Sequence, residues 1–440
     1  ACLVGSEMCI RDRCFITLLT ATISAVTLTN NVKAATKWNT SKSVTKEENG
    51  IKYSAYLTED GKESWIYQIK LSKKITKLTL PKEINQAKLT RVGFGKELYN
   101  KGEDEDAYQN LFGDTIEPWH NCYGDLSNDD KNKQIIETVA IPSTVNQLEI
   151  ATFSGMKKLK SVVIPEQTAS VPAYTFAKCS ALSKVTFSKN MNEIDSTAFV
   201  KSNQVKTFSC PKANKTFAVK KGMLTTRSGK TLVLVPNKMK KLTIPSSVKE
   251  IKANALNGSQ ATSIVIPKSV KKIGAKALES KKITKVSLSS KNKTYKMANN
   301  CIYRKSNGTL TAVLVKTKKI TIPSKVKVID DTVSVMGKIG TKNQVHIPKS
   351  VKKVVEDWMF FGDSATVYFH GTKPPVIVSK FKGNEFTALP IFNKVYVPKK
   401  AKKTYIKWAK DRDGLKWNNL HTFCLLYTSD AADEEDSVDL

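Results

Sequence analysis

The chain is poor in the residues from which most catalytic and metal sites are built. It has four histidines and eight cysteines among 440 residues, and it contains no C-x-x-C, H-E-x-x-H or G-x-S-x-G motif. These spacings are typical of zinc sites, metalloproteases and serine hydrolases. A catalytic triad dispersed along the chain is recognised only by geometry. The sequence therefore favours no enzyme, no cofactor and no metal site, with a dispersed triad left open.

Arginine and acidic residues are also few. Only six of the 72 basic residues are arginine, and the 39 acidic residues leave a formal net charge of +33 that is carried almost entirely by lysine. Nucleic-acid recognition relies on arginine forks and interleaved aromatic rings. We therefore expect no nucleic-acid partner.

No apolar run reaches the roughly 20 residues that a membrane-spanning helix needs. The run CFITLLTATISAVTL at residues 14–28 is shorter and is followed by small residues at Val32 and Ala34, which suit cleavage after Ala34. We predict a signal peptide over residues 14–34 and an exported protein with no integral membrane span after its cleavage.

The two ends differ in composition from the rest of the chain. Residues 1–13 and 423–440 resemble translated sequencing-adapter tails, and we interpret them so, with a genuine acidic tail as the alternative at the second end. Four cysteines remain outside the ends and the leader: Cys122, Cys179, Cys210 and Cys301. We expect buried thiols there, and disulfide pairing after export is the alternative.

The middle of the chain repeats itself. Several apolar positions recur at a fixed interval, as in Phe153, Phe176 and Phe199, and further along the interval shortens by one, as in Ile251 and Ile273. A larger unit also returns, because NKTF at Asn214 recurs as NKTY at Asn292. A fixed period of this length indicates a solenoid, in which each repeat buries its apolar face against its neighbours.

Each repeat contains the pattern of a short strand. Stretches such as LKSVVIP and LSKVTF alternate apolar and polar residues and then stop at proline or serine. Stacked copies align these strands in parallel and place Phe176 in an internal file between Phe153 and Phe199. The predicted fold class is a β-rich solenoid with parallel strands and about 22–23 residues in each repeat.

The repeats IPSTVNQLEIATFSGMKKLKSVVIP and TFAKCSALSKVTFS resemble the BspA-type leucine-rich repeats of bacterial surface and secreted proteins. The resemblance covers roughly residues 75–413 and includes two β-hairpin insertions, FAVKKGMLTTRSGKTLVLVP and YKMANNCIYRKSNGTLTAVLV, and the closing segment VYVPKKAKKTYIKWAKD. It implies a leucine-rich repeat fold, binding of protein or matrix, and no catalysis. No binding motif of the family can be transferred residue by residue.

These patterns divide the exported chain into four segments. They are an N-terminal hairpin and cap at 35–95, an acidic insertion at 96–134, the leucine-rich repeat solenoid at 135–350, and C-terminal repeats with a cap at 351–422. The first segment contains a hairpin over residues 51–71 that we predict to turn at Asp60-Gly61, a favoured two-residue turn.

The acidic insertion has two features that could indicate binding. The four carboxylates of residues 103–106 lack the alternate spacing and the glycine of a calcium loop, which favours a solvated loop over a calcium site. Trp119, His120 and Tyr123 follow, and we expect them to anchor the insertion to the solenoid, with a contact surface as the alternative.

Two further motifs have simple structural interpretations. SGKT at residues 228–231 ends like a phosphate-binding loop, but six residues rather than four separate Gly222 from Gly229. We therefore predict a hairpin turn. His346 lies beside Ile347 on a predicted strand, where a structural histidine with satisfied hydrogen bonds is expected.

The lysines carry the main indication of function. Residues 135–350 hold 39 basic and nine acidic residues, and four lysines each follow the valine that opens the second apolar pair of a repeat. These lysines are Lys249, Lys271, Lys327 and Lys352. Stacked like charges repel each other, so this file must face solvent or an anionic partner. A solvated face that keeps the protein soluble is the alternative to polyanion binding.

We therefore predict a monomeric protein, secreted or attached to the cell surface or cell wall. Its expected role is binding or adhesion to a protein or to an anionic glycan or wall polymer. The second hypothesis is a structural wall protein retained by the attraction of its lysines to teichoic acid, and the third is an enzyme that its repeats deliver.

Overall fold

The alternating stretches form the strands that their pattern predicts. In β11 Ser161–Val163 and β13 Lys184–Thr186, which pair in parallel, the central residues Val162 and Val185 lie side by side and are buried. Equal spacing along the sequence brings equivalent residues together on adjacent strands. The chain is a parallel-strand β-solenoid of about 12 turns with roughly 23-residue spacing, which confirms the predicted fold class.

The computed structural model describes residues 36–95, 108–109, 115–116, 135–340, 342–355, 365–378, 394–410 and 425–426. The predicted leader and both ends, apart from Leu425 and Leu426, lie outside these residues. So do Cys122, Trp119, His120, Tyr123 and the acidic residues 103–106.

The chain divides into two compact units, the first made of residues 1–205 and 209–215 and the second of 206–208 and 216–440. The first unit begins with antiparallel strands β1 Val44–Glu48, β2 Ile51–Leu57 and β3 Glu63–Leu71, followed in the sheet by β6 Ala87–Val92 and β10 Gln147–Leu148. A short strand, β5 Glu83–Ile84, pairs with β6.

Two parallel sheets continue the first unit. One contains β4 Lys77–Thr79, β9 Thr138–Ala140, β11 and β13, and the other contains β12 Ser170–Val171 and β14 Glu193–Ile194. Strands β7 Tyr108–Gln109 and β8 Thr115–Ile116 pair with each other. Strand β15 Thr207–Ser209 lies at the boundary between the two units.

The second unit contains the two hairpin insertions. The first is β16 Phe217–Lys220, β17 Met223–Thr226 and β18 Thr231–Leu234, whose sheet continues with β20 Glu250–Ile251 and β22 Lys272–Ile273. The second is β24 Tyr295–Ala298, β25 Cys301–Arg304 and β26 Leu310–Leu314, whose sheet ends at β29 Ser334–Met336. Both hairpins are antiparallel, as predicted.

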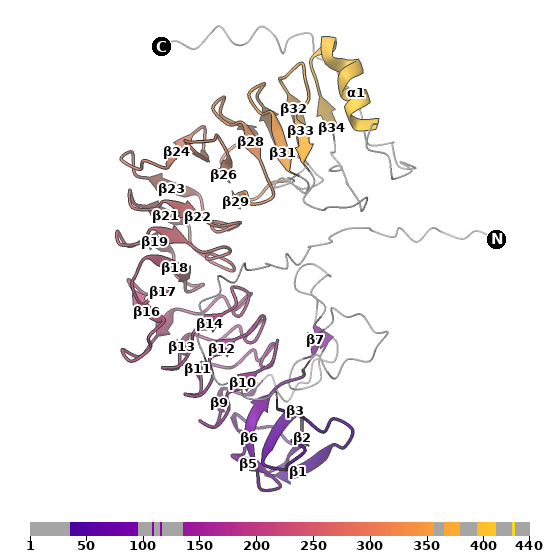
Figure 1. The fold of residues 1–440 in the computed structure, drawn as a ribbon, viewed down its shortest axis with the longest axis vertical. Coiled ribbons are helices and arrows are strands. Elements are labelled where there is room, and N and C mark those ends of the chain that lie inside the picture. Colours follow the sequence, from indigo (N-terminus) through magenta and orange to yellow (C-terminus); the bar gives the residue numbers. More distant parts are fainter. Residues whose placement is uncertain are drawn as a thin grey trace, which may run out of the picture. The chain divides into compact units, whose positions relative to one another are not determined.

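Three parallel sheets complete the second unit. The first contains β19 Lys241–Thr243, β21 Ser263–Ile266 and β23 Lys285–Leu288. The second contains β27 Lys319–Thr321, β30 Gln344–Ile347, β32 Thr366–Phe369, β34 Lys394–Tyr396 and β35 Leu425–Leu426. The third contains β28 Val328–Ile329, β31 Lys353–Val355 and β33 Val376–Val378. The short 3-10 helix Lys399–Ala401 and helix α1 Lys402–Lys410 follow β34, and Figure 1 shows α1 in yellow beside that strand.

The core is built from columns of equivalent residues. Phe176 is fully buried between Phe153 and Phe199, with ring centroids 5.5 and 5.7 Å away, as the repeat predicts. Small polar groups close the same turns, because the Cys179 thiol donates to the carbonyl of Phe153 at 3.2 Å and the equivalent Ser202 hydroxyl donates to that of Phe176 at 2.6 Å. A serine therefore replaces a cysteine in this column without loss of the hydrogen bond.

The recurring asparagines have the same structural role. Both are buried, and the Asn214 side-chain amide donates to the carbonyls of Ser188 and Met191 at 2.9 and 2.8 Å. The Asn292 amide likewise donates to the carbonyl of Val270 at 2.9 Å. Each satisfies backbone acceptors that would otherwise be buried without a partner.

The N-terminal hairpin corrects one predicted turn. Strands β2 and β3 pair as expected, but five residues, 58–62, join them rather than the two-residue turn predicted at Asp60-Gly61. Gly61 has a φ of 69°, and Asp60 is not in the left-handed region that a two-residue type I′ turn requires at both positions. The two-residue turn is instead Asn49-Gly50 between β1 and β2, with φ values of 54° and 76°.

Candidate functional site

The structure places the four sequence-predicted lysines in two runs. Lys249 immediately precedes β20 and Lys271 precedes β22, and the Lys271 amide donates to the Lys249 carbonyl at 2.7 Å. Lys327 precedes β28 and Lys352 precedes β31, and the Lys352 amide donates to the Lys327 carbonyl at 2.9 Å. All four side chains are exposed. We call these four residues the lysine edge.

The second hairpin insertion separates the two runs. Before the first run, the Lys249 amide donates to the carbonyl of Lys230 in the first hairpin turn, at 2.7 Å. Before the second, the Lys327 amide donates to the carbonyl of Gly308 in the second hairpin turn, at 2.9 Å. The turn of each hairpin therefore accepts the backbone hydrogen bond of the first lysine in a run. The lysine edge consists of two separate runs and not of one continuous row of side chains.

The electrostatic surroundings of the two runs differ. In the first, Lys272 pairs with Glu250 on the adjacent strand at 2.8 Å, which partly neutralises the surface beside Lys249 and Lys271. In the second, the position of Glu250 is taken by Val328, which lies opposite the exposed Lys353. Among the described residues, Lys327, Lys352 and Lys353 have no ion-pair partner, so an ion pair like that of Lys272 and Glu250 is absent from this run.

The first hairpin turn confirms the prediction for SGKT. Gly229 has a φ of 68°, and its amide donates to the Thr226 carbonyl at 2.8 Å, closing the turn between β17 and β18. Among the described residues, no group of three or more histidine, cysteine, aspartate or glutamate side chains could hold a metal ion.

Two of the predicted buried thiols are confirmed. Cys179 and Cys301 are free and buried, and burial raises the pKa of each thiol to about 12. A thiol with so high a pKa stays protonated near neutral pH and is a poor nucleophile. Cys210 is half-buried.

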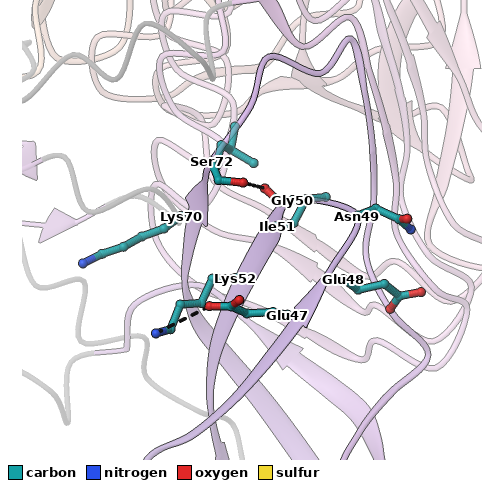
Figure 2. A pocket seen from close by; sticks show the side chains of 9 residues that line it. Glu47, Glu48, Asn49, Gly50, Ile51, Lys52, Lys70 and Ser72 are labelled. Carbon is teal, nitrogen blue, oxygen red and sulfur yellow. Dashed lines mark hydrogen bonds and ion pairs between the residues drawn. The ribbon is translucent and has the colours of Figure 1, made fainter.

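A hollow of about 360 Å³ lies beside the turn between β1 and β2 (Figure 2). Its closing contact is a 3.0 Å hydrogen bond from the Ser72 hydroxyl to the Gly50 carbonyl, and Lys52 and Glu47 approach each other at 3.7 Å. The charges around it are mixed and exposed. We assign this hollow to the packing of the Asn49-Gly50 turn.

His346 differs from its sequence prediction. On β30 the residues Val345 and Ile347 point inward and are buried, so His346 points outward and is half-buried. Its Nδ1 lies 3.0 Å from Nε2 of His370, whereas its own Nε2 is buried and has no hydrogen-bond partner among the described residues. The expectation of a satisfied structural histidine is therefore wrong. Burial, followed by the charges of His370 and Lys319, lowers the pKa of His346 to about 4.

Two tyrosines continue from His346 on the following strands. Tyr368 on β32 and Tyr396 on β34 occupy the same register position as His346, and successive ring centroids are 4.4 Å apart. We call His346, Tyr368 and Tyr396 the aromatic column. The signal was present in the sequence, since QVHIP, TVYFH and KVYVP align as equivalent strands.

Comparison with known families matches six copies of the BspA-type leucine-rich repeat region, over residues 131–221 and 236–366. The chain belongs to the BspA-type leucine-rich repeat family. This family assignment agrees with the resemblance of the repeats and with their observed stacking. Among the described residues of this BspA-type protein, no helix has the length and apolar character needed to cross a membrane.

Several solved structures are similar to this BspA-type chain, whereas no curated protein matches it. A leucine-rich cell surface protein from Faecalibacterium prausnitzii A2-165 is 13% identical, with 79% of this chain and 98% of that chain covered and a TM-score of 0.34. The pneumococcal vaccine antigen PcpA is 15% identical, with 83% and 96% covered and a TM-score of 0.35. A leucine-rich repeat protein from Eubacterium ventriosum ATCC 27560 is 18% identical, with 81% and 79% covered and a TM-score of 0.31.

Proposed function

We propose that this BspA-type protein is an exported, non-catalytic binding protein, secreted or held at the cell surface or wall. Its monomer attaches through the lysine edge to an anionic polymer or to an acidic protein surface, and nucleic acid is not its partner. The observation that carries the proposal is the run of Lys327, Lys352 and Lys353, which are exposed and lack acidic partners among the described residues.

Charge complementarity explains how such an edge works. Exposed charges interact over about 8 Å at physiological salt, and adjacent rungs are about 4.8 Å apart, so neighbouring lysines act together on an extended anion. The affinity then comes from several weak contacts rather than from one pocket. A structural wall protein, retained by attraction of the same edge to teichoic acid, is the alternative biological role.

The test measures binding of the full chain to immobilised heparin and to wall teichoic acid at 50 and 300 mM NaCl. Each single lysine-to-glutamine change in the lysine edge is expected to weaken binding by roughly two- to threefold. We expect the larger effects at Lys327 and Lys352, because Glu250 already reduces the field around Lys249 and Lys271. Lys285→Gln, an exposed lysine on β23, is the matched control for loss of one charge.

Three results would argue against the proposal. Binding that ignores salt, or that one substitution abolishes while the others leave it intact, indicates a shaped pocket elsewhere. Absence of binding at 50 mM NaCl indicates that the lysines serve solubility. A pull-down from host matrix and bacterial wall fractions then separates adhesion from retention in the protein's own wall.

A further inference from the structure

The aromatic column is a regular feature of one outer sheet surface. His346, Tyr368 and Tyr396 stack with interplanar angles of 1° and 8°, and all three side chains are half-buried. Strands β32 and β34, which carry the two tyrosines, lie side by side in the second unit (Figure 1). His370, which is exposed, extends the surface sideways from His346.

The hydrophobic core does not require these rings. The inward residues of the same strands, Val345, Val367 and Val395, are buried and already fill the core. In the parallel sheet of β19, β21 and β23 the equivalent outward positions hold Thr243, Val265 and Ser287, all exposed. Three consecutive aromatic rings at an outward position are therefore a local specialisation of the surface.

The stacking determines which part of each ring a ligand can contact. Because the rings cover one another's faces, their edges are the parts that a ligand can contact. A ring edge is the electropositive part of an aromatic side chain, and a tyrosine hydroxyl donates or accepts hydrogen bonds. The His346 imidazole offers only its ring edge, because its Nε2 is buried and its Nδ1 faces His370. Gln344 and Thr366 lie opposite each other on β30 and β32, two residues before His346 and Tyr368. They add a side-chain amide and a hydroxyl.

The charged side chains described near this surface are lysines. Lys319 lies on the adjacent strand β27, and its positive charge is one of the causes that lower the pKa of His346. The described segments 342–355, 365–378 and 394–410 contain lysines and no aspartate or glutamate. The described residues therefore favour an anionic ligand that also carries groups able to donate and accept hydrogen bonds.

We propose that the aromatic column, with His370, Gln344, Thr366 and Lys319, is a binding site for an anionic polysaccharide that runs across strands β30, β32 and β34. Sugar hydroxyls pair with the tyrosine hydroxyls, the Gln344 amide and the Thr366 hydroxyl, while the acidic groups face Lys319. An acidic peptide offers mainly acceptors in its side chains, which leaves the acceptor groups of this surface without partners. This proposal rests on the proposed function, because it takes from it the class of ligand, a polyanion. The site itself lies on a different sheet from the lysine edge.

The test uses the full chain with three probes: polygalacturonate, its methyl-esterified form, and poly-L-glutamate. Binding is measured at 300 mM NaCl, where the contribution of the lysine edge is screened. The double variant Tyr368→Phe, Tyr396→Phe keeps both rings and removes both hydroxyls, and His346→Gln removes the first ring. Thr243→Ala, at the equivalent outward position on β19, is the matched control, and thermal unfolding verifies that each variant is folded.

We expect the double variant and His346→Gln each to weaken polygalacturonate binding at least about fivefold, with poly-L-glutamate and the control unaffected. Weaker binding of the esterified polymer by the wild type supports the requirement for anionic groups. The proposal is overturned if the column variants bind polygalacturonate like the wild type, or if they lose poly-L-glutamate equally, which indicates an acidic peptide site.

The lysine-edge variants distinguish failure of this site from failure of the proposed function. If the variant with Lys249, Lys271, Lys327 and Lys352 all changed to glutamine loses binding of both polyanions at 50 mM NaCl while the column variants change nothing, the lysine edge alone binds and only the aromatic site is refuted. If the wild type binds no polyanion at 50 mM NaCl, both proposals fail.

Discussion

At the scale of single residues, the internal phenylalanine column makes the register testable by mutation. Phe176 is fully buried and stacked on both sides, so Phe176→Ala removes buried surface and leaves a cavity. We expect a loss of roughly 3–5 kcal/mol in the free energy of unfolding, measured by urea denaturation. Val163→Ala on β11, where the side chain is 63% exposed, is the control and should change stability by less than about 0.5 kcal/mol. An unchanged midpoint for Phe176→Ala would contradict the assigned register.

His346 predicts a dependence of stability on pH. Its pKa is lowered from 6.5 to about 4, first by burial and then by His370 and Lys319, while Tyr368 covers its ring. As pH falls from about 6.5 to 4, the unfolded chain therefore takes up this proton before the folded one does. Stability then falls with pH in this window, and the contribution is fully present above pH 6.5.

The measurement is the Tm of the wild type and of His346→Gln at pH 7 and pH 4.5. Acidic groups titrate in both proteins, so the difference between them isolates His346. We expect the wild type to lose more Tm than the variant, by a few degrees at most because His346 is only half-buried. An equal loss in both proteins would show that His346 titrates normally.

Periodicity explains why Phe176 was predicted and the aromatic column was missed. Alternation within a strand identifies the buried side, and the constant interval from Phe153 to Phe176 to Phe199 identifies the neighbour above and below. His346, Tyr368 and Tyr396 are unequally spaced along the sequence, so a fixed period does not align them. The strand motifs themselves align them, since each ring directly follows a buried valine.

At the scale of secondary-structure elements, strands and hairpins were easier to predict than turns. Both hairpin insertions form, because their apolar runs are separated by turns of residues that accept a positive φ, such as Gly222 in the first and Asn299-Asn300 in the second. Asp60-Gly61 fits a two-residue turn equally well from sequence, but the Thr58 amide donates to the Glu63 carbonyl at 3.0 Å and the Asp60 carboxylate accepts from Thr58 and Lys62. These backbone and side-chain hydrogen bonds favour the longer loop.

The C-terminal helix shows how an element can cap a solenoid. On α1 the buried Tyr405 donates to the Gly371 carbonyl at 3.1 Å, and the Trp408 indole donates to the Pro375 carbonyl at 2.9 Å. Both rings also pack against Phe369 on β32. The sequence indicated a closing segment here, but these carbonyl partners depend on tertiary packing.

At the scale of the whole molecule, charge repulsion opposes the stacking that periodicity dictates. The chain has a formal net charge of +33, and its stacked repeats bring lysines onto adjacent rungs, as in Lys249 and Lys271. Few acidic residues offset this charge, and pairs such as Lys272 with Glu250 are exceptions rather than the rule. Hydrophobic burial must therefore outweigh a repulsive term that salt can screen.

We expect the Tm of the full chain to rise as NaCl increases from 50 to 300 mM, because the Debye length falls from about 14 Å to about 6 Å, close to the spacing of adjacent rungs. The variant in which Lys249, Lys271, Lys327 and Lys352 are all glutamine has four fewer stacked charges, so its Tm should respond less to salt. Differential scanning calorimetry of both proteins measures the two shifts. A wild-type Tm that is insensitive to salt, or a larger response in the variant, would mean that counterions or flexible side chains already relieve the repulsion. In that case the charges of the lysine edge do not destabilise the folded chain. Selection that maintains these lysines would then have no loss of stability to offset.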